Sequence, residues 1–267
     1  MGADIKNLRV RIRSVNSTLH LTKAMGLVAS SKIRRANASM INGQTYAKSV
    51  GKIIDDLTAC PECKKSPYMR TVENPRIRLI VIAGDRGMCG GYNANIFRLM
   101  RDFNDVQIIP IGKRACDRYG NGYTSSEFFS RQDGSDLAAG LCKDFINGEY
   151  DKLGIFCSKY ISVMTQIAEV KWILPIERKT GKSNNSILFE PGESEILNSA
   201  IPEYVSAKII ESVRESFACE VAARRMAMDS AGKNAQKMIS DLTLSYNRAR
   251  QSTITQEITE IVAGSDE

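Results

Sequence analysis

The sequence predicts an α/β protein in which a long antiparallel coiled coil of the N- and C-terminal helices carries a Rossmann-like α/β domain. Both ends of the chain have long segments with apolar residues at coiled-coil spacing and no proline. The middle alternates short β-branched apolar runs with helical stretches. The expected boundaries are 1–58 for the N-terminal helix, 59–75 for a linker, 76–200 for the α/β domain and 201–267 for the C-terminal helix.

The N-terminal segment has the strongest pattern in the sequence. From Ile5 to Leu57, steps of alternately three and four residues reach apolar positions, except at Thr22, Gly26 and Gly43. This heptad spacing is typical of a coiled coil, and a helix of this length would be about 80 Å long. Small residues near the middle of the seam predict that the partner helix approaches closely.

The partner helix is expected within the same chain. The segment from about Glu203 to Val262 has no proline and repeats the same rhythm. Its expected seam residues are Phe217, Val221, Met228, Ala231, Ala235, Met238, Leu242 and Ala249, with Arg224 and Ser245 as polar members. We therefore expect the two ends to pair in antiparallel orientation. The alternative, two separate helices in a bundle, would need more helices than the middle of the chain supplies.

The middle of the chain is expected to form a mostly parallel sheet, because strands and helices alternate there. The expected strands are 77–83, 106–111, 153–158 and 170–176, and the expected helices lie near 93–103, 113–119 and 134–147. Residues 177–196 are expected to form an exposed connection to the last helix.

A glycine-rich stretch, GDRGMCGGYN at 84–93, follows the first expected strand. Its glycines lack the spacing of a dinucleotide-binding loop, and the only Gly-Lys-Ser, at 181–183, has Ile176 where a P-loop requires its first glycine. We therefore expect a tight turn with a glycine at positive φ, followed by a helix that Asn93 caps. No nucleotide cofactor is expected.

Composition limits the chemistry that the chain could perform. It has one histidine and seven scattered cysteines, of which only Cys60 and Cys63 have metal-ligand spacing, without a second pair. No metal site, cofactor, small-molecule ligand or catalytic residue is expected. No apolar run approaches the ~18 residues of a membrane-spanning helix, and the N-terminus has no export signal.

The net charge is +7, and residues 1–57 hold ten Lys or Arg against three Asp or Glu. Such a segment calls for an anionic partner. A basic coiled-coil protein associated with DNA is therefore the alternative hypothesis, motivated by residues such as Arg34 and Arg35. Against it, the expected seam runs through the basic segment itself, which occupies half of that surface. No nucleic-acid partner is expected.

The two ends of the chain resemble the gamma-subunit family of the F-type ATP synthases. The similar stretches are LTKAMGLVASSKIRRAN at 21–37 and SYNRARQSTITQEITEIVAG at 245–264. The stretches GDRGMCGGYN, IGKRA at 111–115 and FEP at 189–191 are also similar to this family, in the same order. The resemblance covers essentially the whole chain.

This resemblance implies a rotor shaft rather than an enzyme in its own right. The coiled coil would turn inside a ring of alpha and beta subunits, with the α/β domain beside the epsilon subunit and above the c ring. Ion flow through the membrane sector would drive the rotation and so ATP synthesis at the beta subunits, making the complex a proton-transporting translocase. The chain would lie peripherally on the cytoplasmic face of a bacterial plasma membrane, as part of the CF(1) sector.

The resemblance also implies roles for individual residues. Expected contacts with the beta subunits are Arg250, Gln251, Thr255 and Glu257, with Lys23 and Met25 on the opposing helix at the same level. Lys23, Arg34 and Arg35 would face an acidic segment of beta. Ile258, Ile261 and Val262 would turn in a hydrophobic sleeve. Phe189 and Glu190 would touch the c ring.

Overall fold

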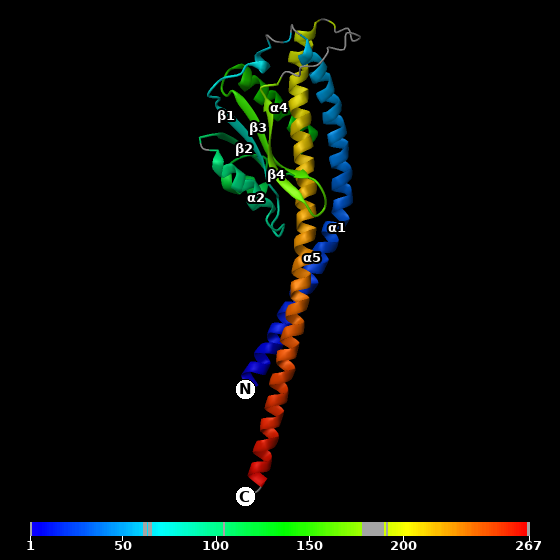
Figure 1. Cartoon of the computed structure of the whole chain (residues 1–267), viewed down its shortest axis with the longest axis vertical. Helices are drawn as coiled ribbons and strands as arrows, with labels where there is room; N and C mark the ends of the chain where they lie inside the picture. The colour runs from blue at the N-terminus through cyan, green and yellow to red at the C-terminus, as the bar shows by residue number, and fades with distance from the viewer. Residues whose placement is uncertain are drawn as a thin grey trace. The chain divides into compact units, whose positions relative to one another are not determined.

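The two ends of the chain form two long helices, as the heptad spacing predicts. Helix α1 spans Gly2–Ala59 and helix α5 spans Glu193–Ser265, and they lie side by side (Figure 1). The computed structural model describes residues 2–60, 63, 66–103, 105–177, 190 and 192–265. Within these residues the chain divides into two compact parts, Met1–Ser30 with Arg224–Glu267, and Ser31–Ala223.

In the first part the helices are antiparallel. A Cβ atom at Gly26 would lie 3.7 Å from the Cβ of Met228. Seventeen residues earlier on α1, the guanidinium of Arg9 donates a 2.9 Å hydrogen bond to the hydroxyl of Tyr246, which is eighteen residues later on α5. The residue numbers of the contacting residues therefore increase along α5 as they decrease along α1, as an antiparallel pair requires.

The second part shows the same orientation. Gly43 lies against Arg214, and a Cβ at Gly51 would lie 3.9 Å from the ring of Tyr204. Every predicted seam position of α1 is buried or half-buried along the two parts, including the polar Thr22. The hydroxyl of Thr22 is satisfied within the helix, because it donates to the carbonyl of Leu19. The antiparallel coiled coil is confirmed.

The predicted seam of α5 was wrong at Met238 and Ser245, whereas Leu242 and Ala249 are half-buried, as predicted. Met238 is 44% exposed and Ser245 is also exposed, whereas their neighbours Ile239 and Tyr246 are half-buried. A straight helix drifts by about 20° per heptad relative to a strict seven-residue repeat. Over the three heptads from Phe217 to Met238 this drift adds up to about 60°, which turns Met238 away from α1 and brings Ile239 closer to it.

Helix α5 also begins earlier than expected. It includes residues 193–196, which the sequence analysis assigned to an exposed connection, and it holds Pro202 in its interior. Proline in a helix removes one backbone hydrogen bond and costs about 3 kcal/mol. Leu197, Ile201 and Val205 are fully buried in this stretch, and burial of such side chains stabilises by about 1.5–3 kcal/mol each. Packing therefore outweighs the proline.

The segment of the chain that connects α1 to α5 forms a four-stranded sheet in the order β2-β1-β3-β4. Strand β1 pairs in parallel with β2 and β3, whereas β3 and β4 form an antiparallel pair. The strands are β1 (Ile77–Ile82), β2 (Gln107–Ile111), β3 (Lys152–Tyr160) and β4 (Gln166–Leu174). The helices are α2 (Tyr92–Leu99), α3 (Lys113–Tyr119) and α4 (Arg131–Ile146), with short 3₁₀ turns at Pro67–Met69 and Met100–Asp102. The predicted, mostly parallel sheet is confirmed.

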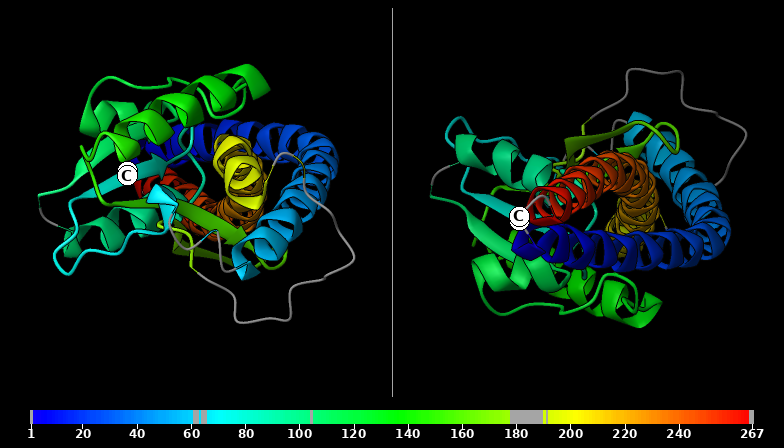
Figure 2. Two further views of the ribbon diagram at one scale, coloured as in Figure 1. Left: turned by 90° about the horizontal axis from the view of Figure 1, so that it is seen from above. Right: turned by 90° about the horizontal axis from the view of Figure 1, so that it is seen from below.

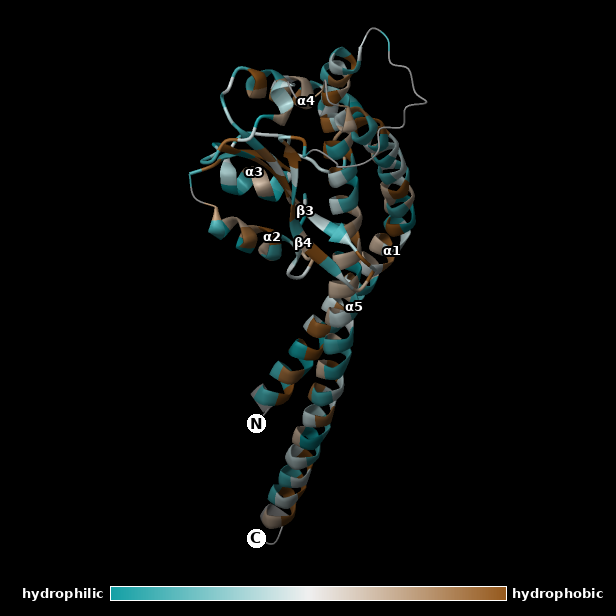
Figure 3. Ribbon diagram, turned by 45° about the horizontal axis from the view of Figure 1, so that its top comes forward, coloured by the Kyte–Doolittle hydropathy of each residue, from teal (hydrophilic) through white to brown (hydrophobic). Residues whose placement is uncertain are grey.

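The sheet is covered on both faces. Alternate residues of β1 point to opposite sides, so Ile80 and Ile82 pack in the cluster that holds α4, and Leu79 and Val81 pack in the cluster that holds α2. Helix α5 contributes to both clusters and lies between the sheet and α1 (Figures 1 and 2). Hydrophobic residues are frequent on the strands, whereas both long helices alternate hydrophobic and hydrophilic residues (Figure 3).

Candidate partner-contact surfaces

The last turns of α5 expose nearly all of their side chains. From Arg250 to Ala263 every residue except Thr253 is exposed, and this end of the helix extends beyond the first residue of α1 (Figure 1). The apolar side chains there are 56% exposed at Ile258, 72% at Ile261 and 56% at Val262. A helix of this kind is typical of a surface that another protein covers.

The polar candidates lie on the same helical end. Arg250, Gln251, Thr255 and Glu257 are all exposed. The Thr255 hydroxyl donates a 2.9 Å hydrogen bond to the carbonyl of Gln251, one turn earlier. The spacing of seven residues places Arg250 and Glu257 on one face of the helix. This face therefore carries an exposed cation and an exposed anion.

Sequence reasoning missed two exposed apolar residues near this face. Ile254 is 45% exposed and Leu244 is 53% exposed. Ile254, Ile258 and Ile261 follow the four-then-three spacing of a helical stripe. Helical spacing alone could have found this stripe. Ile254 is out of phase with the seam, so it belongs to a second apolar stripe that faces away from α1.

The candidates on α1 lie elsewhere along the pair. Lys23 is exposed and Met25 is half-buried, and both flank Gly26, which lies against Met228. The expectation that they lie level with Arg250 was wrong. At 1.5 Å per residue, Arg250 is about 33 Å further along α5 than Met228. The error arose because the sequence alone gives the orientation of the pair but not its register.

Lys23 borders a groove between the two helices. The groove has a volume of about 540 Å³ and forms where Gly26 and Gly232 leave little side-chain bulk. Arg225 and Lys233 also line it, and Lys233 forms a 2.8 Å ion pair with Asp229. The rim of the groove is therefore mainly basic, which suits an acidic partner.

Arg34 and Arg35 are both exposed on α1, in the part from Ser31 to Ala223. Arg35 lines a second groove with Phe128 and Arg214, whereas its neighbour Lys32 forms a 2.5 Å ion pair with Glu127. Of the two predicted c-ring contacts, Glu190 is exposed and Phe189 lies outside the described residues.

The glycine-rich loop follows β1 at the carboxyl end of the sheet, where many α/β proteins bind a ligand. Its turn has Gly90 at a φ of 59°, as expected, but the predicted cap was wrong. Asn93 lies inside α2, whose N-cap is Gly91, and the Asn93 side chain accepts a 2.9 Å hydrogen bond from the N–H of Gly84. The amide side chain closes the loop because it reaches back across the turn.

A side chain of α5 occupies the space beside this loop. A Cβ at Gly84 would lie 2.8 Å from the Cδ of Glu220, which is buried. The Glu220 carboxylate also accepts a 3.4 Å hydrogen bond from the N–H of Asp85. A carboxylate at this position repels a phosphate group and takes up a backbone donor that would bind it.

The described part of the chain contains no cluster of three or more His, Cys, Asp or Glu that could hold a metal ion. Burial raises the pKa of the Cys142 and Cys157 thiols to about 12, so both stay protonated and are poor nucleophiles at neutral pH. No helix in the described ranges has an apolar stretch long enough to cross a membrane.

Comparison with known proteins identifies the family. Residues 4–266 match the family model described as ATP synthase. The ATP synthase gamma chain of Geobacter sp. (strain M21) is 33% identical over 282 residues, which cover 99% of this chain and 98% of that protein. The chain belongs to the ATP synthase gamma chain family. The gamma chain of Heliobacterium modesticaldum is 35% identical, with 97% of each chain covered.

Solved structures of this family share the fold. The rotor of the Euglena gracilis mitochondrial ATP synthase matches with a TM-score of 0.67 at 16% identity, over 95% of this chain and 100% of that chain. The central stalk and c ring of the Tetrahymena thermophila enzyme match with a TM-score of 0.59 at 18% identity, over 79% and 99%. The comparisons give no support to the alternative of a DNA-associated protein.

Proposed function

We propose that this chain is the central rotor shaft of an F-type ATP synthase. The observation that carries this proposal is the antiparallel pair of α1 and α5. The 73-residue helix α5 ends in a solvent-exposed, partly apolar segment. A stiff pair with an exposed tip can turn inside a ring of other subunits. The similarity to ATP synthase gamma chains and to rotor and central-stalk structures fits this role.

The proposed partners are the alpha and beta subunits around the helical pair, the epsilon subunit beside the sheet and the c ring. Arg250, Gln251, Thr255 and Glu257 would contact beta near the tip. Lys23, Met25, Arg34 and Arg35 would contact beta at other levels along the shaft. Exposed charge pairs suit contacts that form and break during rotation, because each is worth only about 0–1 kcal/mol.

The apolar residues Ile258, Ile261 and Val262 would rotate within a hydrophobic sleeve, and Ile254 extends that stripe. Phe189 and Glu190 would contact the c ring. The complex would couple ion transport, with protons as the proposed ion, to ATP synthesis. This chain would be a peripheral component at the cytoplasmic face of a bacterial cell membrane.

The chain would carry torque and perform no chemistry of its own. Glu220 fills the crevice where an α/β domain of this type could hold a phosphate. Nucleotide would therefore bind to the beta subunits, and the chain would belong to a translocase without contributing a catalytic residue.

Reconstitution with purified alpha and beta subunits tests the proposal. The chain should convert them into a stable complex that hydrolyses ATP, and alpha and beta without the chain serve as the control. Failure to form such a complex would contradict the proposal. Tight binding of the chain to duplex DNA that persists at about 200 mM salt would instead favour the DNA-associated alternative.

A further inference from the structure

Strand β3 continues beyond the end of its neighbour β1. The parallel pairing with β1 covers Lys152–Phe156, whereas β3 runs on to Tyr160 and keeps its antiparallel pairing with β4. In this extension, the edge of β3 that pairs with β1 earlier in the strand has no neighbouring strand among the described residues. Unpaired backbone groups at such a position must find other partners.

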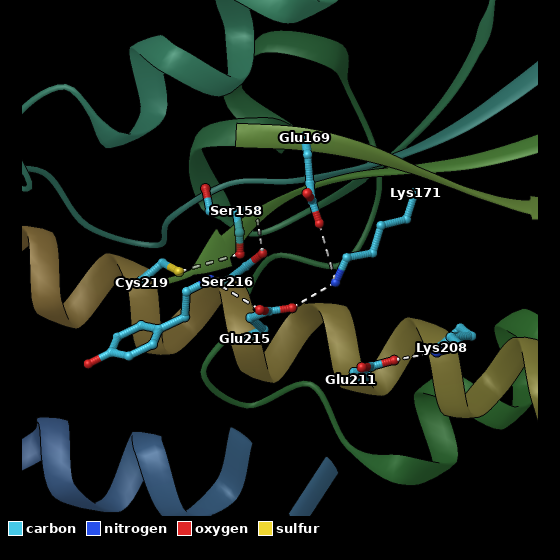
Figure 4. Close-up of polar contacts among 9 residues, drawn as sticks. Ser158, Glu169, Lys171, Lys208, Glu211, Glu215, Ser216 and Cys219 are labelled. Carbon is cyan, nitrogen blue, oxygen red and sulfur yellow. Dashed lines mark hydrogen bonds and ion pairs between the residues drawn. The ribbon is translucent and has the colours of Figure 1, made fainter. Parts of the chain in front are cut away.

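Helix α5 supplies those partners (Figure 4). The N–H of Ser158 donates a 3.2 Å hydrogen bond to the hydroxyl of Ser216, and the N–H of Tyr160 donates a 3.1 Å bond to the carboxylate of Glu215. The thiol of Cys219 donates to the carbonyl of Ser158 at 3.4 Å. The side chains of α5 thus take the place of β1 along the end of β3.

Glu215 also binds the next strand. The ammonium of Lys171 on β4 lies 2.7 Å from Glu215 Oε2 and 3.8 Å from Glu169 Oε1. Burial opposes a charge on Lys171, but the neighbouring Cys157 and the hydrogen bond to the Glu215 carboxylate together hold the pKa of Lys171 above its ordinary value. The Glu215 side chain is only 4% exposed. A single buried carboxylate therefore joins two strands to the long helix.

These polar contacts differ in kind from the apolar packing around them. Burial of apolar side chains is non-directional, so it permits small sliding movements between a helix and a sheet. Hydrogen bonds require a narrow range of distance and angle, and charge-assisted bonds are the stronger ones. The contacts of Glu215 and Ser216 therefore resist sliding of α5 along the sheet.

We infer that Glu215, Lys171 and Ser216 form a joint that transmits torque between the sheet and the shaft helix α5. The inference rests on the proposed function, since only a rotating shaft loads this contact. Torque applied to the sheet by a partner would reach α5 through the joint. Without the joint the shaft would slip against the sheet under load.

The decisive variant is Glu215→Gln, because glutamine can still accept the Tyr160 N–H but cannot pair with a charged Lys171. The complete ATP synthase carrying this variant is reconstituted into vesicles, and ATP hydrolysis and ion pumping are measured against increasing opposing gradients. Hydrolysis without a gradient should stay near wild type. Pumping per ATP should fall as the gradient rises, by about tenfold at the highest gradient.

Lys208→Met is the matched control. It removes a 2.9 Å ion pair to Glu211 that stays within α5. This variant should pump as the wild type does at every gradient. Lys171→Met removes the joint from the other side and should reproduce the load-dependent defect of Glu215→Gln.

The load dependence separates a joint from a role in folding alone. A variant that only destabilises the fold loses hydrolysis and pumping together at every gradient, and this result would overturn the inference. Wild-type pumping by Glu215→Gln at the highest gradient would also overturn it. Failure of the wild-type chain to assemble with alpha and beta subunits would contradict the proposed function itself, which is a distinguishable outcome.

Discussion

Helix α5 contains two stretches with opposite environments. From Tyr204 to Arg224 no residue is exposed, because the sheet and α1 surround the helix. From Arg250 to Ala263 only Thr253 is shielded. The first stretch supplies the stability of the fold, whereas the second keeps isoleucines in contact with solvent. The apolar residues of one helix therefore fall into two groups: those that build the core, and those that stay exposed and that we propose contact a partner.

The largest difference in stability should appear when isoleucine is replaced by alanine once in the buried stretch and once in the exposed stretch. Ile209 is fully buried and Ile258 is 56% exposed. Ile209→Ala should lower the free energy of unfolding by about 2–5 kcal/mol, because it leaves a cavity. Ile258→Ala should change it by less than about 0.5 kcal/mol. Denaturant unfolding of the purified chain measures both, and equal losses would erase the distinction between the stretches.

A second prediction concerns the contact of the glycine loop with the buried stretch. Gly84→Ala should destabilise the chain by about 1–3 kcal/mol, because its Cβ would lie 2.8 Å from Glu220. Gly140→Ala on α4 is the control, since its Cβ would meet nothing within 4 Å. This control should stabilise by about 0.5–1 kcal/mol. A neutral Gly84→Ala would show that Glu220 moves aside without cost.

A third prediction concerns acid stability of the sheet. Hydrogen bonds from Arg76 to Asp151, 2.9 Å at the shorter contact with its Nε, lower the pKa of the Asp151 carboxyl. A carboxyl with a depressed pKa stabilises the fold above its unfolded pKa of about 3.9, and this contribution is lost as the pH falls through the folded value. Asp151→Asn should therefore lower the Tm at pH 7, and this deficit should shrink as the pH falls below the unfolded pKa of about 3.9. A constant deficit across this range would contradict the assignment.

The smallest effect on stability should come from the exposed stretch. Arg250→Ala and Glu257→Ala should each change the free energy of unfolding by less than about 0.5 kcal/mol, because both side chains are exposed. Both should lower coupled ATP synthesis in the reconstituted complex. Parallel losses of Tm and synthesis would show that these side chains are structural. Lys237→Ala, also exposed on α5 outside the predicted contacts, serves as the control.

The sequence predicts the periodic features of this fold well, but it predicts poorly which residues of α1 and α5 lie opposite each other. The seam of α1 follows from heptad spacing because each apolar residue there meets the partner helix. The position of Lys23 relative to Arg250 does not, because small seam residues fit several registers. Likewise, the first turns of α5 were not predicted as helix, because Pro202 disfavours a helix there. Burial of Leu197 and Ile201 stabilises these turns.

The polar contacts between α5 and the sheet could not be found from sequence patterns. Glu215 and Glu220 are buried charges in a helix, and a period analysis treats such residues as solvent-facing. Their partners, Lys171 and the loop at Gly84, are far away in the sequence. Only the three-dimensional structure shows that the Glu215 carboxylate binds the end of β3 and that Glu220 packs against Gly84.

Rotation of the chain tests the central claim most directly. The alpha and beta subunits of the reconstituted complex are fixed to a surface, and a visible label is attached at position 164, where Met164 is 77% exposed. We expect ATP to drive the label in one direction around the axis of the helical pair. A label that stays still while the same complexes hydrolyse ATP would contradict it.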